Sequence, residues 1–314
     1  MAAPSLSRPR SARARFDPPV LRARWTLDAP CSDAELLASL PERTGWDAAT
    51  IERLLRHGGV HLDGRPHGRD DLPARLAAGT LVDLHALADE PEPVRIEPER
   101  VLAERDDWLA LDKPAHVAVQ ATRASRLAAL EPALRAARGE PDWVAAHRLD
   151  RETSGVVVFA RGARAAARLG AVFAQRLARK RYLALVSPPP EADTFVVSGW
   201  VARTLHPTRH RYALRPGPAP GHRASETRFR VLARAGAHAL LEAEPITGRT
   251  HQIRVHCEAH GCPIVGDTRY GGLPAPRVQL HAAELSFTDR GEVVCLRAPL
   301  PDDLEPIFRE LAGA

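Results

Sequence analysis

Apolar residues follow the period of a β-strand through most of the chain beyond residue 98. Short runs rich in Val, Leu and Ala, bounded by turn residues, predict strands. The expected strands are 101–104, 108–111, 155–160, 181–186, 226–232, 239–243 and 280–287. Helical spacing is clear over 163–177 and is expected again toward His260. Many strands with few helices predict an α+β fold around a mixed, mainly antiparallel sheet.

A smaller unit precedes this sheet. Residues 48–56 have helical spacing, a Gly58-Gly59 turn follows, and 60–62 and 80–84 read as short strands. The arrangement resembles the small alpha-L RNA-binding module shared with a small-subunit ribosomal protein. We therefore expect a small α+β RNA-binding module over 25–88, with an unrelated appendage as the alternative.

Composition sets the expected domain limits. Residues 1–24 mix Arg, Ser, Pro and Ala, which predicts a flexible basic arm or an inert tail. Residues 89–98 are acidic and proline-rich and are interpreted as a linker. The larger, catalytic domain then covers 99–314, and nothing in the sequence demands more than a monomer.

The overall charge is basic, at +5 with a pI near 9.4, which suits a phosphate-rich partner. No apolar run reaches the roughly 18 residues that a membrane span needs, and the first residues lack the apolar centre of a secretory signal. Four scattered cysteines do not form a disulfide framework. These features predict a cytoplasmic protein with reduced thiols and no membrane partner.

Polar residues gather in the connection 146–155, between two apolar stretches. Asp150 lies at its centre, and a carboxyl with a reference pKa of about 3.9 is ionised near neutrality and can act as nucleophile or base. Arg148 and Arg151 flank it and can hold RNA phosphates. The alternative is an ordinary loop in which Asp150 caps a turn.

Two further segments carry candidate chemistry. Thr250 stands where an N-cap would begin a helix, and Arg254 follows four residues later on the same face. A buried carboxylate needs a cationic partner, and a guanidinium can hold one in fixed orientation. Tyr182 follows the basic run 179–181, where an aromatic ring can stack on an unstacked base.

Together these segments resemble the RluA family of pseudouridine synthases over about residues 101–300. The motifs are H-R-L-D at 147–150, T-S-G at 153–155, K-R-Y at 180–182 and T-G-R-T-H-Q-I-R-V-H at 247–256, with L-D-K-P at 111–114 and G-D at 266–267 in support. The resemblance implies the pseudouridine synthase fold. One departure is His116, where the family usually has glycine.

Carried over position by position, the resemblance makes Asp150 the catalytic aspartate and Arg254 its salt-bridge partner. Tyr182 becomes the aromatic that contacts the target base, and Leu280 packs against the flipped nucleotide. Arg148, Arg151 and Arg249 are the candidates for holding the distorted RNA backbone.

The activity implied is an isomerase that converts uridine to pseudouridine in structured RNA, with no cofactor and no metal. Large-subunit ribosomal RNA is the first expected substrate and transfer RNA the second. Asp150 would either attack the anomeric carbon of the ribose or remove a sugar proton to give a glycal, and the sequence leaves both routes open.

Two other classes of protein compete with this interpretation. His256-Cys257-Glu258 has the H-x-E spacing of a zinc-dependent base deaminase, and Cys262 lies nearby, but the P-C-x-x-C part of that site is absent. An RNA-binding or ribosome-assembly protein that lacks activity is the non-enzymatic alternative. The phosphate-binding motifs of nucleotide-dependent enzymes do not occur.

Overall fold

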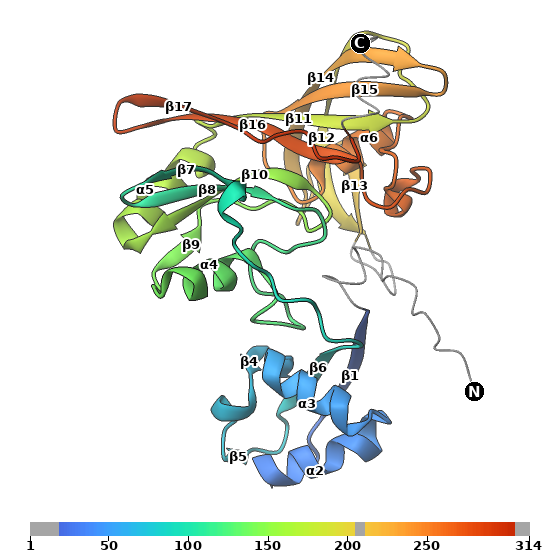
Figure 1. Ribbon diagram of the computed structural model, residues 1–314. Helices are drawn as coiled ribbons and strands as arrows, with labels where there is room; N and C mark the ends of the chain where they lie inside the picture. The colour runs from blue at the N-terminus through green and yellow to red at the C-terminus, as the bar shows by residue number, and fades with distance from the viewer. Residues whose placement is uncertain (1–18, 205–210, 305–314) are drawn as a thin grey trace, which may run out of the picture. The chain divides into compact units, whose positions relative to one another are not determined.

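The computed structural model describes residues 19–204 and 211–304. They form two compact units (Figure 1). The first combines the described residues up to Ile96 with Val117–Pro141, and the second combines Glu97–His116 with the described residues from Asp142 on. Both contain helices and sheets, which confirms the predicted α+β class.

The first unit is built on a four-stranded antiparallel sheet with two helices against it. The strand order is β1-β6-β3-β4, and leucines of the helices and strands make the core. The strands of the first unit are β1 (Val20–Thr26), β2 (Cys31–Ser32), β3 (Val60–Leu62), β4 (Arg65–His67), β5 (Arg75–Leu76) and β6 (Leu81–Leu87), of which β2 and β5 pair in a separate two-stranded sheet. Its helices are α2 (Asp33–Thr44), α3 (Ala48–His57), the short η1 (Arg69–Asp71) and α4 (Leu130–Arg138).

The last residues of the predicted flexible arm form part of strand β1. Residues 20–24 belong to an ordered strand that pairs with β6 along its whole length. Leu21, Ala23 and Trp25 pack against the core, whereas Arg22 and Arg24 are exposed. The exposed arginines made this alternating strand look like a basic tail in the sequence. Residues 1–18 of the predicted arm lie outside the described residues.

The segment 117–141 groups with the first unit, although the sequence assigned it to the larger domain. Ser125 Oγ lies 2.8 Å from His57 Nδ1 at the end of α3, and the Arg126 amide donates to the His57 carbonyl at 2.8 Å. The Arg126 guanidinium also holds both oxygens of Asp71, at 3.0 and 3.1 Å. These bonds tie the segment to residues more than fifty positions earlier in the chain.

The second unit contains a large mixed sheet. Nine strands follow one another in the order β13-β12-β14-β15-β11-β16-β10-β8-β7, with β17 beside β16 and β9 beside β10. The strands are β7 (Val101–Arg105), β8 (Trp108–Lys113), β9 (Trp143–Ala145), β10 (Ser154–Arg161), β11 (Arg179–Val186), β12 (Thr194–Thr204), β13 (Arg211–Arg215), β14 (Arg223–Ala235), β15 (His238–Pro245), β16 (Leu280–Asp289) and β17 (Glu292–Arg297). Its helices are α5 (Gly162–Ala174) and α6 (Gln252–Ala259), with the short η2 (Pro98–Arg100) and η3 (Thr268–Tyr270).

One parallel pair joins the two halves of this otherwise antiparallel sheet. Ser154 and Gly155 of β10 pair with His281 and Ala282 of β16. Gly155 has φ of 110°, and a Cβ there would lie 2.2 Å from the Ala282 carbonyl oxygen. Only glycine permits this approach, so the glycine of the T-S-G motif sets the position where the 146–153 connection enters the sheet.

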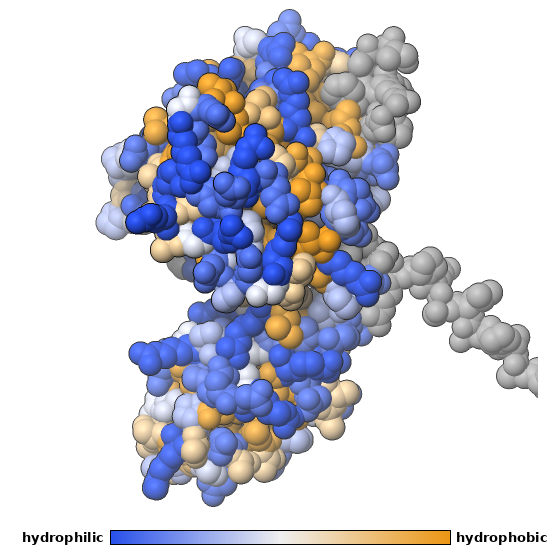
Figure 2. All heavy atoms as spheres, turned by 60° about the vertical axis from the view of Figure 1, so that its left-hand side comes forward, coloured by the Kyte–Doolittle hydropathy of each residue, from blue (hydrophilic) through white to orange (hydrophobic). Residues whose placement is uncertain are grey.

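The two helices pack on different parts of the sheet. Ala165, Leu169 and Val172 of α5 pack with β8, β10 and β16, while Ile253 and Cys257 of α6 join a core formed by β11, β14 and β15. Hydrophilic side chains cover most of the face seen in Figure 2, with separate hydrophobic patches among them. None of the helices in the described ranges is long and apolar enough to cross a membrane.

Candidate active site

Asp150 lies in the connection between β9 and β10. Leu149 is buried and anchors the connection, and the Thr153 amide donates to the Asp150 carbonyl at 3.1 Å to close a turn. The Asp150 side chain remains 25% exposed. The sheet therefore fixes the backbone around Asp150 while its carboxyl stays accessible.

Helix α6 brings Arg254 to Asp150, but it begins later than predicted. The residue before its first turn is His251, which has φ of 57° and makes no side-chain cap, and Thr250 is exposed outside the helix. The predicted N-cap at Thr250 is thus wrong. The backbone makes a left-handed turn at His251, which leaves Thr250 unable to occupy the capping position.

Gln252 fixes the turn that precedes α6. Its buried amide nitrogen donates to the Glu226 carbonyl and to Thr227 Oγ1 on β14, both at 2.9 Å. Its amide oxygen accepts from the Arg249 amide at 3.0 Å and from the Thr247 hydroxyl. One side chain therefore fastens the T-G-R-T-H-Q segment to the sheet, which sets the position of Arg254 on the first turn of the helix.

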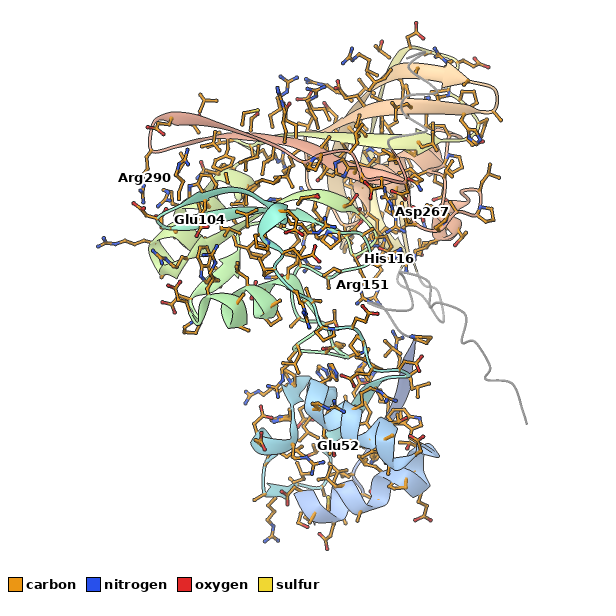
Figure 3. The ribbon with its side chains drawn as sticks, viewed as in Figure 1. Glu52, Glu104, His116, Arg151, Asp267 and Arg290 are labelled. Carbon is orange, nitrogen blue, oxygen red and sulfur yellow. The ribbon has the colours of Figure 1, made fainter. Side chains whose placement is uncertain are left out.

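Arg254 is nearly fully buried and contacts three carboxylates. Its Nε and Nη2 donate to the two oxygens of Asp267 at 2.6 and 2.8 Å. Its Nη1 lies 3.3 Å from Glu152 Oε2 and 3.7 Å from Asp150 Oδ2. Arg254 does lie beside Asp150, as the resemblance implied. Its bidentate partner, however, is Asp267, for which no role was predicted (Asp267 is labelled in Figure 3).

The charges of this cluster stabilise one another. Burial acts to lower the pKa of Arg254, but its hydrogen bonds to Asp267 and the charges of Asp267, Glu152 and Asp150 outweigh burial and raise the pKa. Burial acts to raise the pKa of Glu152, but the charge of Arg254, a backbone hydrogen bond and the charge of Arg269 together outweigh it, and the pKa falls to about 2. Arg254 and Glu152 are therefore both charged at neutral pH.

Lys113, in the L-D-K-P motif, lies under the Asp150 connection. Its ammonium is fully buried and donates to the Arg151 carbonyl at 3.0 Å and to the Pro114 carbonyl at 2.8 Å. Burial lowers the pKa of Lys113 to about 7, although Glu152 and Asp150 oppose this shift. His116, which replaces the family's glycine, has φ of 68°, so the turn keeps a left-handed backbone with a histidine in it.

Tyr182 and Leu280 lie on the neighbouring strands β11 and β16. Burial, together with the Asp150 charge, raises the pKa of Tyr182, so its phenol is neutral at neutral pH. The ring is partly buried against the core. Leu280 is only 3% exposed and belongs to that core. Its expected contact with a flipped nucleotide stays a prediction.

The predicted RNA-binding arginines Arg148, Arg151 and Arg249 differ in exposure and in their contacts. Arg148 is exposed, whereas Arg151 is half-buried and supplies its carbonyl to Lys113 (Arg151 is labelled in Figure 3). Arg249 donates to the Ala224 carbonyl at 2.9 Å. Burial, and the charges of Arg176 and Arg223, lower the pKa of Arg249. A Cβ on Gly248 would lie 3.7 Å from Lys180 Nζ, so the Lys180 ammonium also lies close to this turn.

The residues of the zinc-deaminase alternative are engaged elsewhere. His256 Nε2 lies 2.9 Å from Ser225 Oγ, and Cys257 and Cys262 are buried in a hydrophobic core. Within 19–204 and 211–304, no three His, Cys, Asp or Glu side chains are grouped as a metal site requires. The H-x-E spacing therefore does not correspond to a deaminase centre.

The chain is similar in sequence to RNA pseudouridine synthases. The family model for RNA pseudouridylate synthase matches residues 107–259. "Ribosomal large subunit pseudouridine synthase C" of Vibrio parahaemolyticus is 31% identical over 287 residues, which cover 84% of this chain and 88% of the relative. The protein of that name in Escherichia coli K12 is 31% identical over 294 residues, which cover 86% of this chain and 90% of the relative.

Solved structures show the same fold. Human RNA pseudouridylate synthase domain containing 1 superposes with a TM-score of 0.54 at 25% identity, over 70% of this chain and 98% of that one. Human RNA pseudouridylate synthase domain containing 4 superposes with a TM-score of 0.56 at 23% identity, over 68% of this chain and 93% of that one. This chain belongs to the RluA family of RNA pseudouridine synthases, and its activity is that of an isomerase.

Proposed function

We propose that this chain isomerises specific uridines of large-subunit ribosomal RNA, with Asp150 as the catalytic carboxylate. The names of the relatives at 31% identity support this choice of RNA over transfer RNA. The observation that carries the assignment of Asp150 is its position 3.7 Å from Arg254, a buried arginine that Asp267 holds in a bidentate ion pair.

Isomerisation breaks the bond between C1′ of the ribose and N1 of uracil, turns the base and joins C1′ to C5. The C5 hydrogen leaves to solvent and N1 gains a proton, so no oxidant, reductant or nucleotide enters the balance. Asp150 acts on the ribose, and Arg254 orients its carboxylate. Tyr182 presents a neutral ring to the detached uracil, since its raised pKa disfavours a phenolate at neutral pH.

The RNA must be distorted before this chemistry can begin, since a stacked uridine cannot reach Asp150. Arg148, Arg151 and Arg249 hold the RNA backbone in this proposal, and Arg176, Lys180 and Arg223 extend the positive surface around Arg249. Like charges that gather in this way favour a polyanionic ligand. The N-terminal module adds affinity for RNA, and the enzyme works as a cytoplasmic monomer without metal or cofactor.

Mapping pseudouridine in ribosomal RNA tests the proposal. The substrate is total RNA from cells that lack the gene, incubated with the full chain in the presence of a chelator. Wild type should modify discrete positions of the large-subunit RNA, and Asp150→Asn should modify none. Asp106→Asn, a change at an exposed aspartate, is the matched control and should behave as wild type.

Three results would count against parts of the proposal. Modification of transfer RNA alone would overturn the substrate, and modification by Asp150→Asn would overturn the catalytic residue. Loss of activity when the chelator is present would overturn the proposed independence from metal.

A further inference from the structure

His251 occupies an unusual backbone position next to Asp150. Its φ of 57° is left-handed, a backbone conformation that strains a residue with a side chain. The ring does not cap helix α6, because it makes no hydrogen bond to the backbone of the first turn. Instead the side chain turns inward and is only 11% exposed. Strain of this kind, without a capping role, indicates that the ring is needed elsewhere.

Tyr270 holds one side of the His251 ring. Its hydroxyl lies 2.7 Å from His251 Nδ1, and the Tyr212 amide donates to the same hydroxyl oxygen at 3.1 Å. Tyr270 is fully buried, and burial raises the pKa of Tyr270 to about 12. The Tyr270 hydroxyl therefore keeps its proton. Among the described residues, His251 Nδ1 is the atom to which it can donate this proton in a hydrogen bond.

The protonation of His251 follows from this arrangement. Burial lowers the pKa of His251, although Asp150 opposes the shift, so the ring is neutral at neutral pH. A neutral ring that accepts at Nδ1 carries its proton on Nε2. The chain of bonds from the Tyr212 amide through the Tyr270 hydroxyl thus selects the Nε2–H tautomer.

The Nε2 side of the ring faces Asp150. Nε2 lies 4.0 Å from Asp150 Oδ2, the same oxygen that lies 3.7 Å from Arg254 Nη1. Tyr212 and Tyr270 contact the ring edge-on, with interplanar angles of 75° and 87°, so its plane is fixed. The charged groups around His251 are Asp150, Glu152, Arg254 and Arg269.

We propose that His251 is a positioning residue of the reaction, which donates a hydrogen bond from Nε2–H to the Asp150 carboxylate when RNA is bound. The proposal rests on the proposed function for the role of Asp150. The 4.0 Å separation shortens as the site closes on the ribose, since catalytic hydrogen bonds are often long in an enzyme without substrate. Arg254 and His251 then approach Asp150 Oδ2 from two directions and fix its orientation.

The first measurement is the protonation of the His251 ring in the full chain, by ¹⁵N nuclear magnetic resonance near pH 7.5. The Nε2–H tautomer is expected in wild type. In Tyr270→Phe the hydroxyl is lost and a mixture of tautomers is expected. A protonated ring or an Nδ1–H tautomer in wild type would overturn the proposal, and this result does not depend on any activity.

The second measurement compares His251→Gln with His251→Met. The two side chains have similar length and flexibility and strain the backbone alike, but only Gln places an N–H donor where Nε2 stands. We expect His251→Met to lower kcat by about tenfold or more with KM nearly unchanged, and Gln to recover most of that loss. Melting temperatures of the two variants should agree.

The outcomes separate the two proposals. Equal kcat values for the Gln and Met variants would overturn the role of the Nε2 donor. Alone, Tyr270→Phe should lower kcat relative to wild type. Added to His251→Met it should cause no further loss, because the Tyr270 hydroxyl acts through the His251 ring. If wild type itself makes no pseudouridine in any ribosomal RNA, the proposed function fails, while the tautomer measurement still decides the state of His251.

Discussion

At the scale of single residues, the buried ion pair of Arg254 with Asp267 is the strongest constraint in the site. Arg254→Met should lower the free energy of unfolding by about 3 to 5 kcal/mol, because Asp267 is left buried without its cation. The double variant Arg254→Met/Asp267→Asn should regain part of this loss. Urea denaturation measures both, and a loss below about 1 kcal/mol for the single variant would contradict the ion pair's role.

Lys113 should make stability depend on pH above neutrality. Its pKa in the folded protein is about 7, whereas that of an unfolded lysine is near 10.5. Between these values the unfolded chain binds more protons, so stability rises with pH through this window. Below pH 7 the lysine is protonated in both states and its contribution no longer changes.

Urea denaturation of wild type and Lys113→Met from pH 6 to pH 10 measures this effect. Relative to the variant, wild type should gain stability from about pH 7 upward, by at most about 1.4 kcal/mol per pH unit. Parallel curves for the two proteins would show that the lysine keeps an ordinary pKa.

The sequence predicted part of this site and missed part of it. Asp150 and Arg254 could be paired because both stand in dense polar motifs. Asp267 could not, because its place depends on tight packing of the 263–273 turn: a Cβ on Gly266 or Gly272 would lie 1.7 or 1.9 Å from backbone oxygens. Such long-range contacts leave no periodic signal. The same holds for His251, whose left-handed backbone displaced the predicted helix start.

At the scale of elements, the parallel contact between β10 and β16 depends on Gly155. Gly155→Ala should lower the free energy of unfolding by about 2 kcal/mol or more, since its Cβ would collide with the Ala282 carbonyl. Activity should fall with it, because the Asp150 connection enters β10 here.

Gly170→Ala in α5 is the matched control. Nothing lies within 4 Å of a Cβ at this helical position, so the change should be neutral or stabilising by up to about 1 kcal/mol. Thermal denaturation compares the two variants. Equal melting temperatures would show that the β10–β16 contact can relax around a methyl group.

The elements themselves were predicted where the pattern was strong. The central strands β8, β10, β11 and β16 are apolar runs, and α5 has clear helical spacing. Elements in which polar or helix-breaking residues interrupt the apolar pattern were not predicted. Helix α2 contains Pro41 in its interior, and β1 alternates arginines with its buried residues. Their stability comes from tertiary packing, which local propensity does not report.

At the scale of the whole molecule, residues 117–141 should unfold together with the first unit. Leu54→Ala removes a fully buried side chain of that unit and should cost about 2 to 5 kcal/mol. Hydrogen exchange of 117–141 should accelerate along with that of β6, while β10 keeps its protection. Leu169→Ala, a matched change in α5, should leave 117–141 unaffected. If hydrogen exchange of 117–141 accelerated in Leu169→Ala and not in Leu54→Ala, the result would contradict the assignment of 117–141 to the first unit.

The central claim is that Asp150 isomerises uridine within RNA, and release of the C5 hydrogen measures that chemistry most directly. Ribosomal RNA labelled with tritium at C5 of uridine is mixed with excess enzyme in a single turnover. Wild type and Asp106→Asn should release tritium to water in amounts that match the pseudouridine formed, and Asp150→Asn should release none. Release by Asp150→Asn at the wild-type rate would contradict the account.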